Sequence, residues 1–308
     1  MFDVDRGEKL QDLHIVEYKL FQDFKISFSD KNSNPLPLII IAGVNGTGKT
    51  TILEFIKSEI AHNSIYFPAQ YSLNDIKEFM PKYIEKMVYE EDIVASKIYK
   101  RVRNYINSIL DGFDMKIVFD SRDGEGNLFF RNKRGDKLSI DDISTGEKTL
   151  LSKVLYLYFK DIRNQIVLID EPELSLHPSW QNKILKLYET FAKENNCQII
   201  IATHSPHIIG SAKNEWIRLL AMNENDEVEV INDVLAYGRD IEWVLEEVMG
   251  IQYTREESVS KKIKECQELL NDDKYDEAEI CIDTLEKVIG ENDSEVLAMR
   301  NDIAFWRD

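Results

Sequence analysis

The feature that most constrains this chain is the octapeptide GVNGTGKT at residues 43–50. It follows the β-branched run 38–42 (LIIIA), which predicts a buried strand, and it opens a probable helix over residues 49–61. Glycines let the backbone wrap around an anion, and the helix start adds positive potential. This order predicts a phosphate-binding loop, in which Lys49 reaches the β- and γ-phosphates and the Thr50 hydroxyl binds Mg²⁺.

Two further apolar runs are each followed by side chains that could act on a phosphate bound at that loop. Residues 165–169 (QIVLI) are followed by Asp170 and Glu171, and residues 197–202 (CQIIIA) lead into His204. Because the carboxyl ends of parallel strands meet at one sheet edge, these side chains are expected in the same crevice as the loop. Asp170 is predicted to hold Mg²⁺ through water, Glu171 to be the general base, and His204 to contact the γ-phosphate. The alternatives are a structural helix cap for the carboxylates and a structural role for the histidine.

A fourth candidate, Gln70, ends the stretch SIYFPAQ, whose residues 64–67 also predict a strand. Gln70 is a candidate for sensing Mg²⁺ or the attacking water, and a plain surface glutamine is the open alternative. Strands alternate with probable helices over residues 49–61, 145–159 and 178–193, which predicts an α/β fold with a mainly parallel sheet. Antiparallel β-structure is expected at 13–28 and 113–140, and helical structure at 72–110.

The charge and the cysteines restrict partners and compartment. The formal net charge of −18 makes the surface repel nucleic acid on average, so DNA or RNA would need a local basic patch. The three cysteines are widely spaced and lack metal-ligand spacing, which predicts reduced thiols in a cytoplasmic protein. The longest apolar run, 36–44, is too short to span a bilayer, and the charged N-terminal stretch lacks a signal peptide's apolar segment. We therefore expect no membrane partner.

The sequence changes character after about residue 240. Residues 255–308 hold 8 Lys and Arg against 16 Asp and Glu, a net charge of −8, and apolar residues recur at helical spacing. We therefore expect a main domain at 1–238, with a helical and β insertion at about 71–140, and an acidic helical domain at 239–308. Whether that domain packs on the main body, on a second copy or on another protein stays open.

Taken together, these motifs resemble the ABC-type ATPase superfamily over about residues 13–232. GVNGTGKT resembles the Walker A motif, and IVLIDEPELSLHP at 166–178 resembles Walker B with its D-loop. IIIATHSP at 199–206 resembles the switch-histidine loop. ISTGEKTLL at 143–151 falls where this superfamily carries its signature motif, shortly before Walker B.

The resemblance implies ATP and Mg²⁺ as cofactors and assigns residues to them. It assigns ATP hydrolysis to Glu171, His204 and Gln70. It assigns binding of Mg²⁺ to Thr50, Asp170 and Gln70. In this superfamily two ATPase bodies sandwich two nucleotides head to tail, so the signature would serve the opposite subunit of a homodimer or higher oligomer. The implied nucleotide-binding residues are Gly43, Asn45, Gly46, Thr47, Gly48, Lys49, Thr50, Thr51, Ser144, Gly146 and Glu147.

Details of the motifs favour one branch of the superfamily, the branch that contains SMC, RecF and OLD-type ATPases. Transporter subunits usually read LSGGQ where this chain reads ISTGE. Only about 90 residues separate Walker A from the signature, which leaves no room for a long SMC coiled coil. After residue 240 no catalytic carboxylate cluster like that of OLD nucleases is visible. GRDIEWVLEEVMG at 238–250 and the acidic tail resemble compact ATPases of bacterial anti-phage systems, such as the Septu-type subunit.

Three functions follow from this resemblance. The first is an ATPase that regulates a partner effector, a nuclease or toxin, in an anti-phage complex. The second is a DNA-repair ATPase that clamps DNA itself, and the third, disfavoured by the signature, is the nucleotide-binding subunit of a transporter. The DNA hypothesis depends on basic residues that could instead form a solvated face, namely Lys97, Lys100, Arg101, Arg103, Arg131, Lys133 and Arg134.

Overall fold

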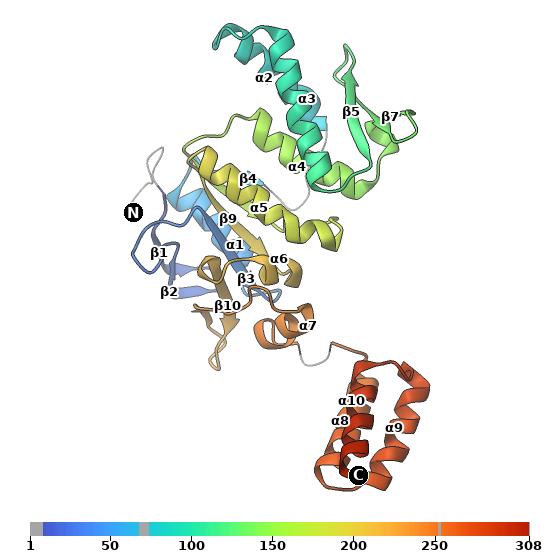
Figure 1. The fold of residues 1–308 in the computed structure, drawn as a ribbon. Coiled ribbons are helices and arrows are strands. Elements are labelled where there is room, and N and C mark those ends of the chain that lie inside the picture. The colour runs from blue at the N-terminus through green and yellow to red at the C-terminus, as the bar shows by residue number, and fades with distance from the viewer. Residues whose placement is uncertain (1–8, 68–73, 252–253, 308) are drawn as a thin grey trace. The chain divides into compact units, whose positions relative to one another are not determined.

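The structure is a computed structural model that describes residues 9–67, 74–251 and 254–307. The chain divides into two compact units, which we call unit 1 (Met1–Val244) and unit 2 (Leu245–Asp308) and describe separately (Figure 1). The division falls a few residues after the expected domain boundary at 238–239. Among the described residues, no helix combines the length and apolarity that crossing a bilayer requires.

Unit 1 is built on a sheet of six strands in the order β11-β10-β3-β9-β8-β4. All neighbouring pairs are parallel except β10 and β11, which are antiparallel. The three central strands are buried along their whole length, which explains why they read as continuous apolar runs. The strands are β3 (Leu38–Gly43), β4 (Ile65–Phe67), β8 (Ile166–Asp170), β9 (Gln198–Thr203), β10 (Ile217–Met222) and β11 (Val228–Ile231).

Helices cover both faces of this sheet. Helix α1 and helix α5 both pack on β3 and β9. The chain crosses from β3 to β4 in one direction and from β8 to β9 in the other, so right-handed crossovers put α1 and α5 on opposite faces (Figure 1). The helical segments here are α1 (Lys49–Phe55), its π-helical continuation η1 (Ile56–Ile60), α4 (Thr145–Phe159), α5 (Pro178–Glu194), α6 (Pro206–Ser211), the 3₁₀ turn η3 (Asn214–Trp216) and α7 (Ile241–Trp243).

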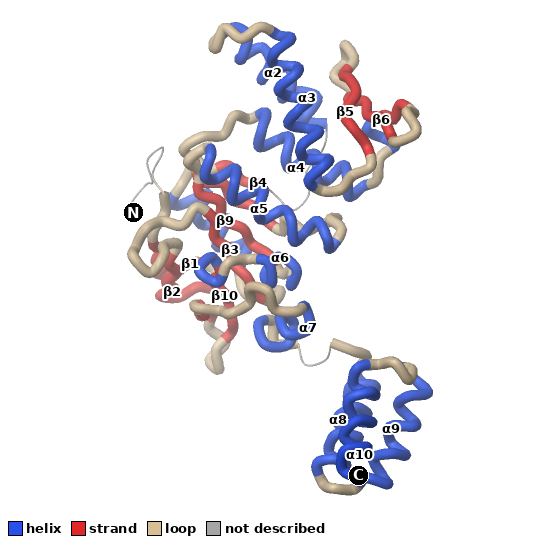
Figure 2. The backbone as a smooth tube through the Cα atoms, in the orientation of Figure 1, coloured by secondary structure: helices blue, strands red, loops and turns tan. Residues whose placement is uncertain are grey.

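The insertion before α4 has a core of its own. Helix α3 buries Ile98, Val102 and Ile106 at helical spacing against Phe119 and Phe130 of a small antiparallel sheet. Leu151, Leu155 and Phe159 of α4 join the same core, so α4 belongs to both parts of unit 1. The insertion comprises α2 (Asn74–Tyr89), α3 (Ala95–Gly112), β5 (Ile117–Arg122), β6 (Leu128–Asn132), β7 (Lys137–Ser139) and the 3₁₀ turn η2 (Ile140–Asp142) (Figure 2).

The N-terminal strands β1 (Asp12–Tyr18) and β2 (Phe21–Ser27) form a separate antiparallel hairpin. Alternate residues such as Leu13, Ile15 and Phe24 are buried, as the alternating sequence indicated. The predicted fold class is therefore confirmed: a mixed, mainly parallel sheet with antiparallel β-structure and C-terminal helices.

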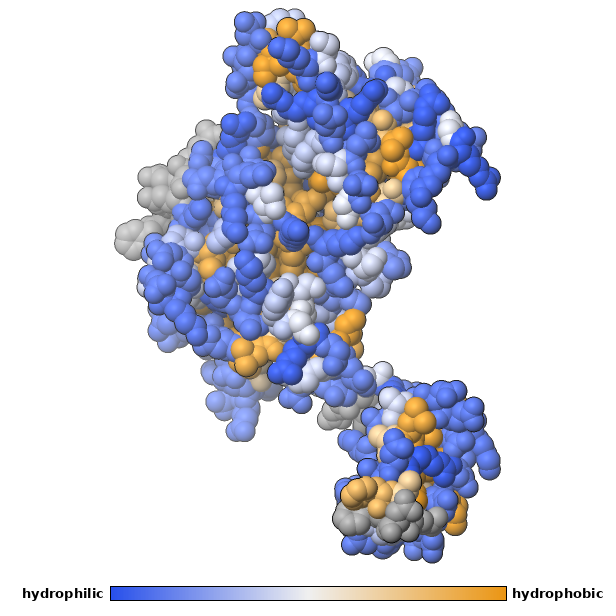
Figure 3. All heavy atoms as spheres, viewed as in Figure 1, coloured by the Kyte–Doolittle hydropathy of each residue, from blue (hydrophilic) through white to orange (hydrophobic). Residues whose placement is uncertain are grey.

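The π-helical turn η4 (Val244–Val248) spans the boundary between the two units. Unit 2 contains three helices, α8 (Glu257–Asn271), α9 (Tyr275–Ile289) and α10 (Ser294–Arg307). Their buried residues, including Ile263, Ile282 and Met299, form one small core. Ile280 and Val288 of α9 stay exposed, and Figure 3 shows hydrophobic side chains among the mainly hydrophilic surface of this unit.

A disulfide between Cys266 and Cys281 joins α8 to α9, with a Cα–Cα distance of 5.6 Å. The expectation that all cysteines are reduced thiols is therefore wrong for this pair. The two helices form an antiparallel hairpin whose turn brings the cysteines together, a proximity that sequence spacing alone does not reveal. Cys197 remains a free, buried thiol.

We expect the denatured chain to offer one reactive thiol without reductant and three after reduction. Because the bridge closes a loop of 15 residues, its removal by paired Cys→Ser changes should destabilise unit 2 by about 3 kcal/mol. Thiol titration in denaturant and thermal unfolding measure the two effects. Cys197→Ser is the control, which should remove the single free thiol, and three thiols without reductant would refute the pairing.

Candidate active site

The loop of residues 43–50 connects β3 to α1, as predicted, and two of its glycines are required by close neighbours. Gly43 has φ 149°, and a Cβ there would lie 2.7 Å from the carbonyl oxygen of Leu220 on β10. Gly48 has φ 87°, and a Cβ there would lie 2.6 Å from the Phe21 ring of the N-terminal hairpin. Larger residues would force the loop away from both elements. Asn45 and Gly46 lie exposed at the loop, and Thr51 lies on α1.

Lys49 is held inside this loop, with 7% of its surface exposed. Its Nζ donates to the carbonyl oxygens of Gly43, at 2.9 Å, and Val44, at 2.8 Å. The Thr47 hydroxyl also donates to Val44, at 2.9 Å. Burial lowers the pKa of Lys49, while the nearby carboxylates, Glu171 foremost, oppose that shift. The ammonium group is thus positioned by the backbone of the loop that it is predicted to serve.

Asp170 at the end of β8 is joined to the loop through Thr50. The Thr50 hydroxyl lies 3.1 and 3.0 Å from the two carboxylate oxygens of Asp170, and the Tyr66 hydroxyl donates to one of them at 3.2 Å. Burial raises the pKa of Asp170, which is 8% exposed, while these two hydrogen bonds oppose the shift. A hydroxyl and a carboxylate are hard oxygen donors, and Mg²⁺ beside phosphates needs only one or two such protein ligands. This pair therefore fits the metal.

Glu171 and His204 lie beside each other at the ends of neighbouring strands. The register pairs Asp170 with Ala202, and the Glu171 backbone N–H donates to the Ala202 carbonyl at 2.9 Å. Glu171 has φ 43°, a left-handed conformation that costs a non-glycine residue about 1 kcal/mol or more. Its Oε1 lies 3.0 Å from Nδ1 of His204, although the geometry falls short of a hydrogen bond. The structure therefore brings together both side chains that the strand ends predicted.

The signature residues lie elsewhere on unit 1. Ser144 caps α4 in a reciprocal capping box with Glu147, whose Oε2 accepts from the Ser144 N–H and hydroxyl, each at 2.8 Å. A Cβ at Gly146 would lie 3.0 Å from the carbonyl oxygen of Ser175, so the start of α4 packs on the D-loop. Among the described residues, no hydrogen bond or ion pair joins this capping box to the loop of residues 43–50. Gln70 lies outside the described residues.

Sequence reasoning missed three polar residues around these motifs. Tyr66 lies on β4, whose pairing with β8 brings its hydroxyl to Asp170. Burial first, and then the charge of Asp170, raise the pKa of Tyr66, so its hydroxyl stays a donor. The other two, Lys153 on α4 and Glu173 on the D-loop, are buried charges. No local motif marks any of the three, because each depends on a neighbour distant in sequence.

The basic residues considered for DNA divide into two groups. Lys97, Lys100 and Arg101 are exposed on α3, and Lys133 and Arg134 are exposed between β6 and β7. Arg131 instead pairs with the Asp120 carboxylate at 2.7 Å, and Arg103 donates to the Asp120 carbonyl at 2.6 Å. These two arginines are therefore engaged within the insertion.

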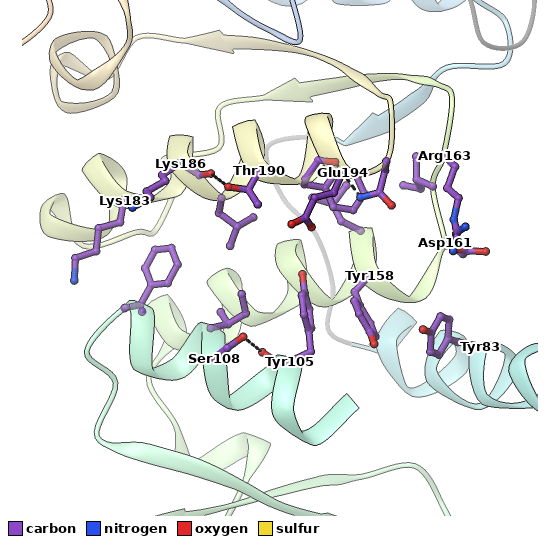
Figure 4. Close-up of a pocket in the computed structure, with 18 of the residues that line it drawn as sticks. Tyr83, Tyr105, Ser108, Tyr158, Asp161, Arg163, Lys183, Lys186, Thr190 and Glu194 are labelled. Carbon is purple, nitrogen blue, oxygen red and sulfur yellow. Dashed lines mark hydrogen bonds and ion pairs between the residues drawn. The ribbon is translucent and has the colours of Figure 1, made fainter. Parts of the chain in front are cut away.

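A cavity of about 790 Å³ lies between α3, the end of α4 and α5 (Figure 4). Stacked Tyr105 and Tyr158, with ring centroids 3.9 Å apart, stand in its wall, and Lys183, Lys186 and Glu194 project from α5. Among the residues that the structure describes, none of those predicted to bind nucleotide or metal lines it. The cavity is therefore separate from the crevice at the strand ends.

Comparisons with known proteins agree with the motifs. A family model described as "AAA domain, putative AbiEii toxin, Type IV TA system" matches residues 93–210. The Retron Ec83 probable ATPase of Escherichia coli is 30% identical over 257 residues, which are 78% of this chain and 44% of that protein. The Septu protein PtuA of Bacillus thuringiensis is 34% identical over 112 residues, 35% of this chain and 28% of that protein. The chain thus spans less than half the length of these curated relatives.

A solved structure of an SMC head, bound to the C-winged helix domain of ScpA, shares the fold. Its TM-score is 0.51 at 14% identity, and the match covers 73% of this chain and 97% of that chain. The loop, the carboxylates at the end of β8 and the histidine after β9 occupy the places that the motifs predicted. The chain is thus similar to the retron and Septu ATPases in sequence and to an SMC head in fold, which agrees with the resemblance to the ABC-type ATPase superfamily that its motifs show.

Proposed function

We propose that this chain hydrolyses Mg-ATP in a head-to-tail pair of ATPase units and thereby regulates a partner effector, a nuclease or toxin, in an anti-phage complex. The observation that carries the hydrolytic part is the convergence of Lys49, Thr50, Asp170, Glu171 and His204 at one end of the parallel strands. Each side chain has the chemistry that phosphoryl transfer to water needs.

Each of these five side chains has its own role in ATP hydrolysis. Lys49 and the loop N–H groups bind the β- and γ-phosphates, and Thr50 and Asp170 hold the metal. Magnesium, when bound, neutralises charge that develops on the phosphate oxygens. Glu171 accepts a proton from the attacking water, and His204, beside it at 3.0 Å, contacts the γ-phosphate.

The pairing of two chains is supported by the position of the signature. Ser144 is exposed at the start of α4, and Gly146 packs on Ser175 of its own D-loop. A serine hydroxyl and the N–H groups of a helix start favour an anion, and here the Glu147 carboxylate, which accepts from the Ser144 hydroxyl and N–H, would have to turn away to admit one. A second chain's γ-phosphate would supply that anion, so ATP would hold two units together and hydrolysis would release them.

Light scattering with and without ATP tests the pairing. We expect ATP to double the molecular mass of the wild-type protein, whereas ADP leaves it unchanged. Ser144→Arg should bind ATP with wild-type affinity and remain single, because the arginine fills the space of the second chain's phosphate. Ser139→Arg, at another capping serine on the same unit, is the matched control and should still pair. ATP-driven pairing of Ser144→Arg would refute the role of the signature.

The effector part of the proposal is supported by similarity to the retron and Septu proteins and by the resemblance of residues 238–250 to Septu-type subunits. Co-purification of the full chain from its native cells tests it, with a nuclease or toxin as the expected companion. A membrane protein would instead point to a transporter subunit. Strongly salt-dependent DNA binding by the purified chain would favour the DNA-clamping alternative.

A further inference from the structure

Two buried charges flank the active site without belonging to the predicted machinery. Lys153 of α4 is 4% exposed and Glu173 of the D-loop is 6% exposed. Charged side chains this deeply buried are costly unless they are paired or hydrogen-bonded. Their contacts lead to the two residues proposed to act on the γ-phosphate.

Glu173 fixes the backbone that carries His204. Its Oε1 accepts from the Thr203 hydroxyl at 2.6 Å and from the His204 N–H at 3.1 Å, and it lies 3.6 Å from the His204 ring nitrogen Nδ1. The other oxygen, Oε2, is buried and has no hydrogen-bond partner among the described residues. One carboxylate therefore orients the strand end at β9, and its negative charge needs a nearby counter-charge.

Lys153 fixes the backbone that carries Glu171. Its Nζ donates to the carbonyl oxygens of Pro172, at 2.8 Å, and Glu171, at 3.4 Å. Burial lowers the pKa of Lys153 to about 8, and the charge of Glu173 is the strongest influence that opposes this shift. Lys153 and Glu173 form no ion pair with each other; Lys153 bonds to the backbone of residues 171 and 172, and Glu173 bonds to the strand end at residues 203 and 204.

Lys153 also belongs to the helix that starts at the signature. Gly146 in its first turn packs on Ser175, and Lys153 two turns later contacts Pro172. Helix α4 therefore contacts the segment of residues 172–175 at two points along its length. A rigid helix that shifts when Ser144 engages a second chain's nucleotide would carry the Pro172 and Glu171 carbonyls with it.

We propose that Lys153 and Glu173 are positioning residues whose hydrogen bonds to adjoining parts of residues 171–173 and 203–204 couple the start of α4 to Glu171 and His204. Through them, engagement of Ser144 by the nucleotide of a second chain sets the orientation of the general base and of the histidine. This inference rests on the proposed function and deepens it. It explains how a nucleotide bound at the signature of one chain affects Glu171 and His204 of that same chain.

A double-mutant cycle on ATP hydrolysis tests the coupling. Lys153→Met and Glu173→Gln should each lower kcat by about tenfold or more and leave the KM for ATP within about twofold. The double variant should hydrolyse ATP about as well as the better single variant, because the two side chains act in series on the same segment and either change breaks the link. Lys153→Arg, which keeps the charge, should retain most of kcat.

Matched controls are exposed residues of α5, Lys186→Met and Glu194→Gln, whose kcat should equal that of the wild type. Thermal unfolding of every variant shows that the comparison is made on folded protein. Losses that multiply in the double variant, an effect confined to KM, or a Lys153→Arg variant as inactive as Lys153→Met would each overturn this inference alone. Wild-type protein that hydrolyses no ATP would overturn the proposed function instead.

Discussion

Glu171→Gln is expected to bind ATP as the wild type does and to hydrolyse it about 10²–10³ times more slowly. Glutamine matches glutamate in size and backbone preference, so it keeps the left-handed turn after β8 and the contact with His204. It cannot accept a proton from water, so the step that needs a base is lost while the phosphate contacts of Lys49 remain. Single-turnover hydrolysis and equilibrium ATP binding, measured separately, distinguish the two effects.

The same variant should hold two chains together. If ATP joins two units and only hydrolysis separates them, blocked hydrolysis should trap the pair, visible as a doubled mass that persists as long as ATP is present. Glu194→Gln, the same change at an exposed glutamate of α5, should leave both rate and pairing unchanged. A Glu171→Gln protein that turns over like the wild type would show that another residue is the base.

Much of the fold follows from local sequence because its central elements are strongly patterned. The β-branched runs of β3, β8 and β9 are buried on both faces, and helix α4 spans the predicted residues 145–159. Strands β10 and β11 were not predicted. Their sequences, IRLLAM and VEVI, are short, and their place beside β3 depends on pairing between residues about 180 apart in the chain.

In the active site, too, residues in contiguous motifs were predicted, and residues whose partners are distant in sequence were missed. Loop residues and strand-end carboxylates were predicted because each motif lies on contiguous sequence and parallel strands end at one edge. Tyr66 was missed because 104 residues separate it from Asp170, and Lys153 because a lysine in a helix gives no local sign of burial. Their roles exist only once β4, β8 and α4 are in place.

Mixing two inactive variants gives the most direct evidence on whether the site is shared between chains. Lys49→Ala removes the ammonium that bonds to Gly43 and Val44, and it should weaken ATP binding by about 100-fold or more. Ser144→Arg keeps its own loop intact and lacks a usable signature. Each variant alone should be nearly inactive in steady-state hydrolysis.

In a head-to-tail pair formed from one chain of each variant, one site joins the intact loop of the Ser144→Arg chain to the intact signature of the Lys49→Ala chain. Because neither variant should pair with itself, productive pairs are mixed and hold one intact site of two, so an equimolar mixture should recover up to about half of wild-type activity if the sites act independently. Lys49→Ala mixed with Glu171→Gln is the control, because both defects fall on the same half-site and no pairing restores it. A mixture of Lys49→Ala and Ser144→Arg that stays inactive, although both proteins are folded and exchange partners, would mean that loop and signature serve the same chain. Recovery in the first mixture alone would make two chains the unit that hydrolyses ATP, since no single chain in that mixture carries an intact set of residues.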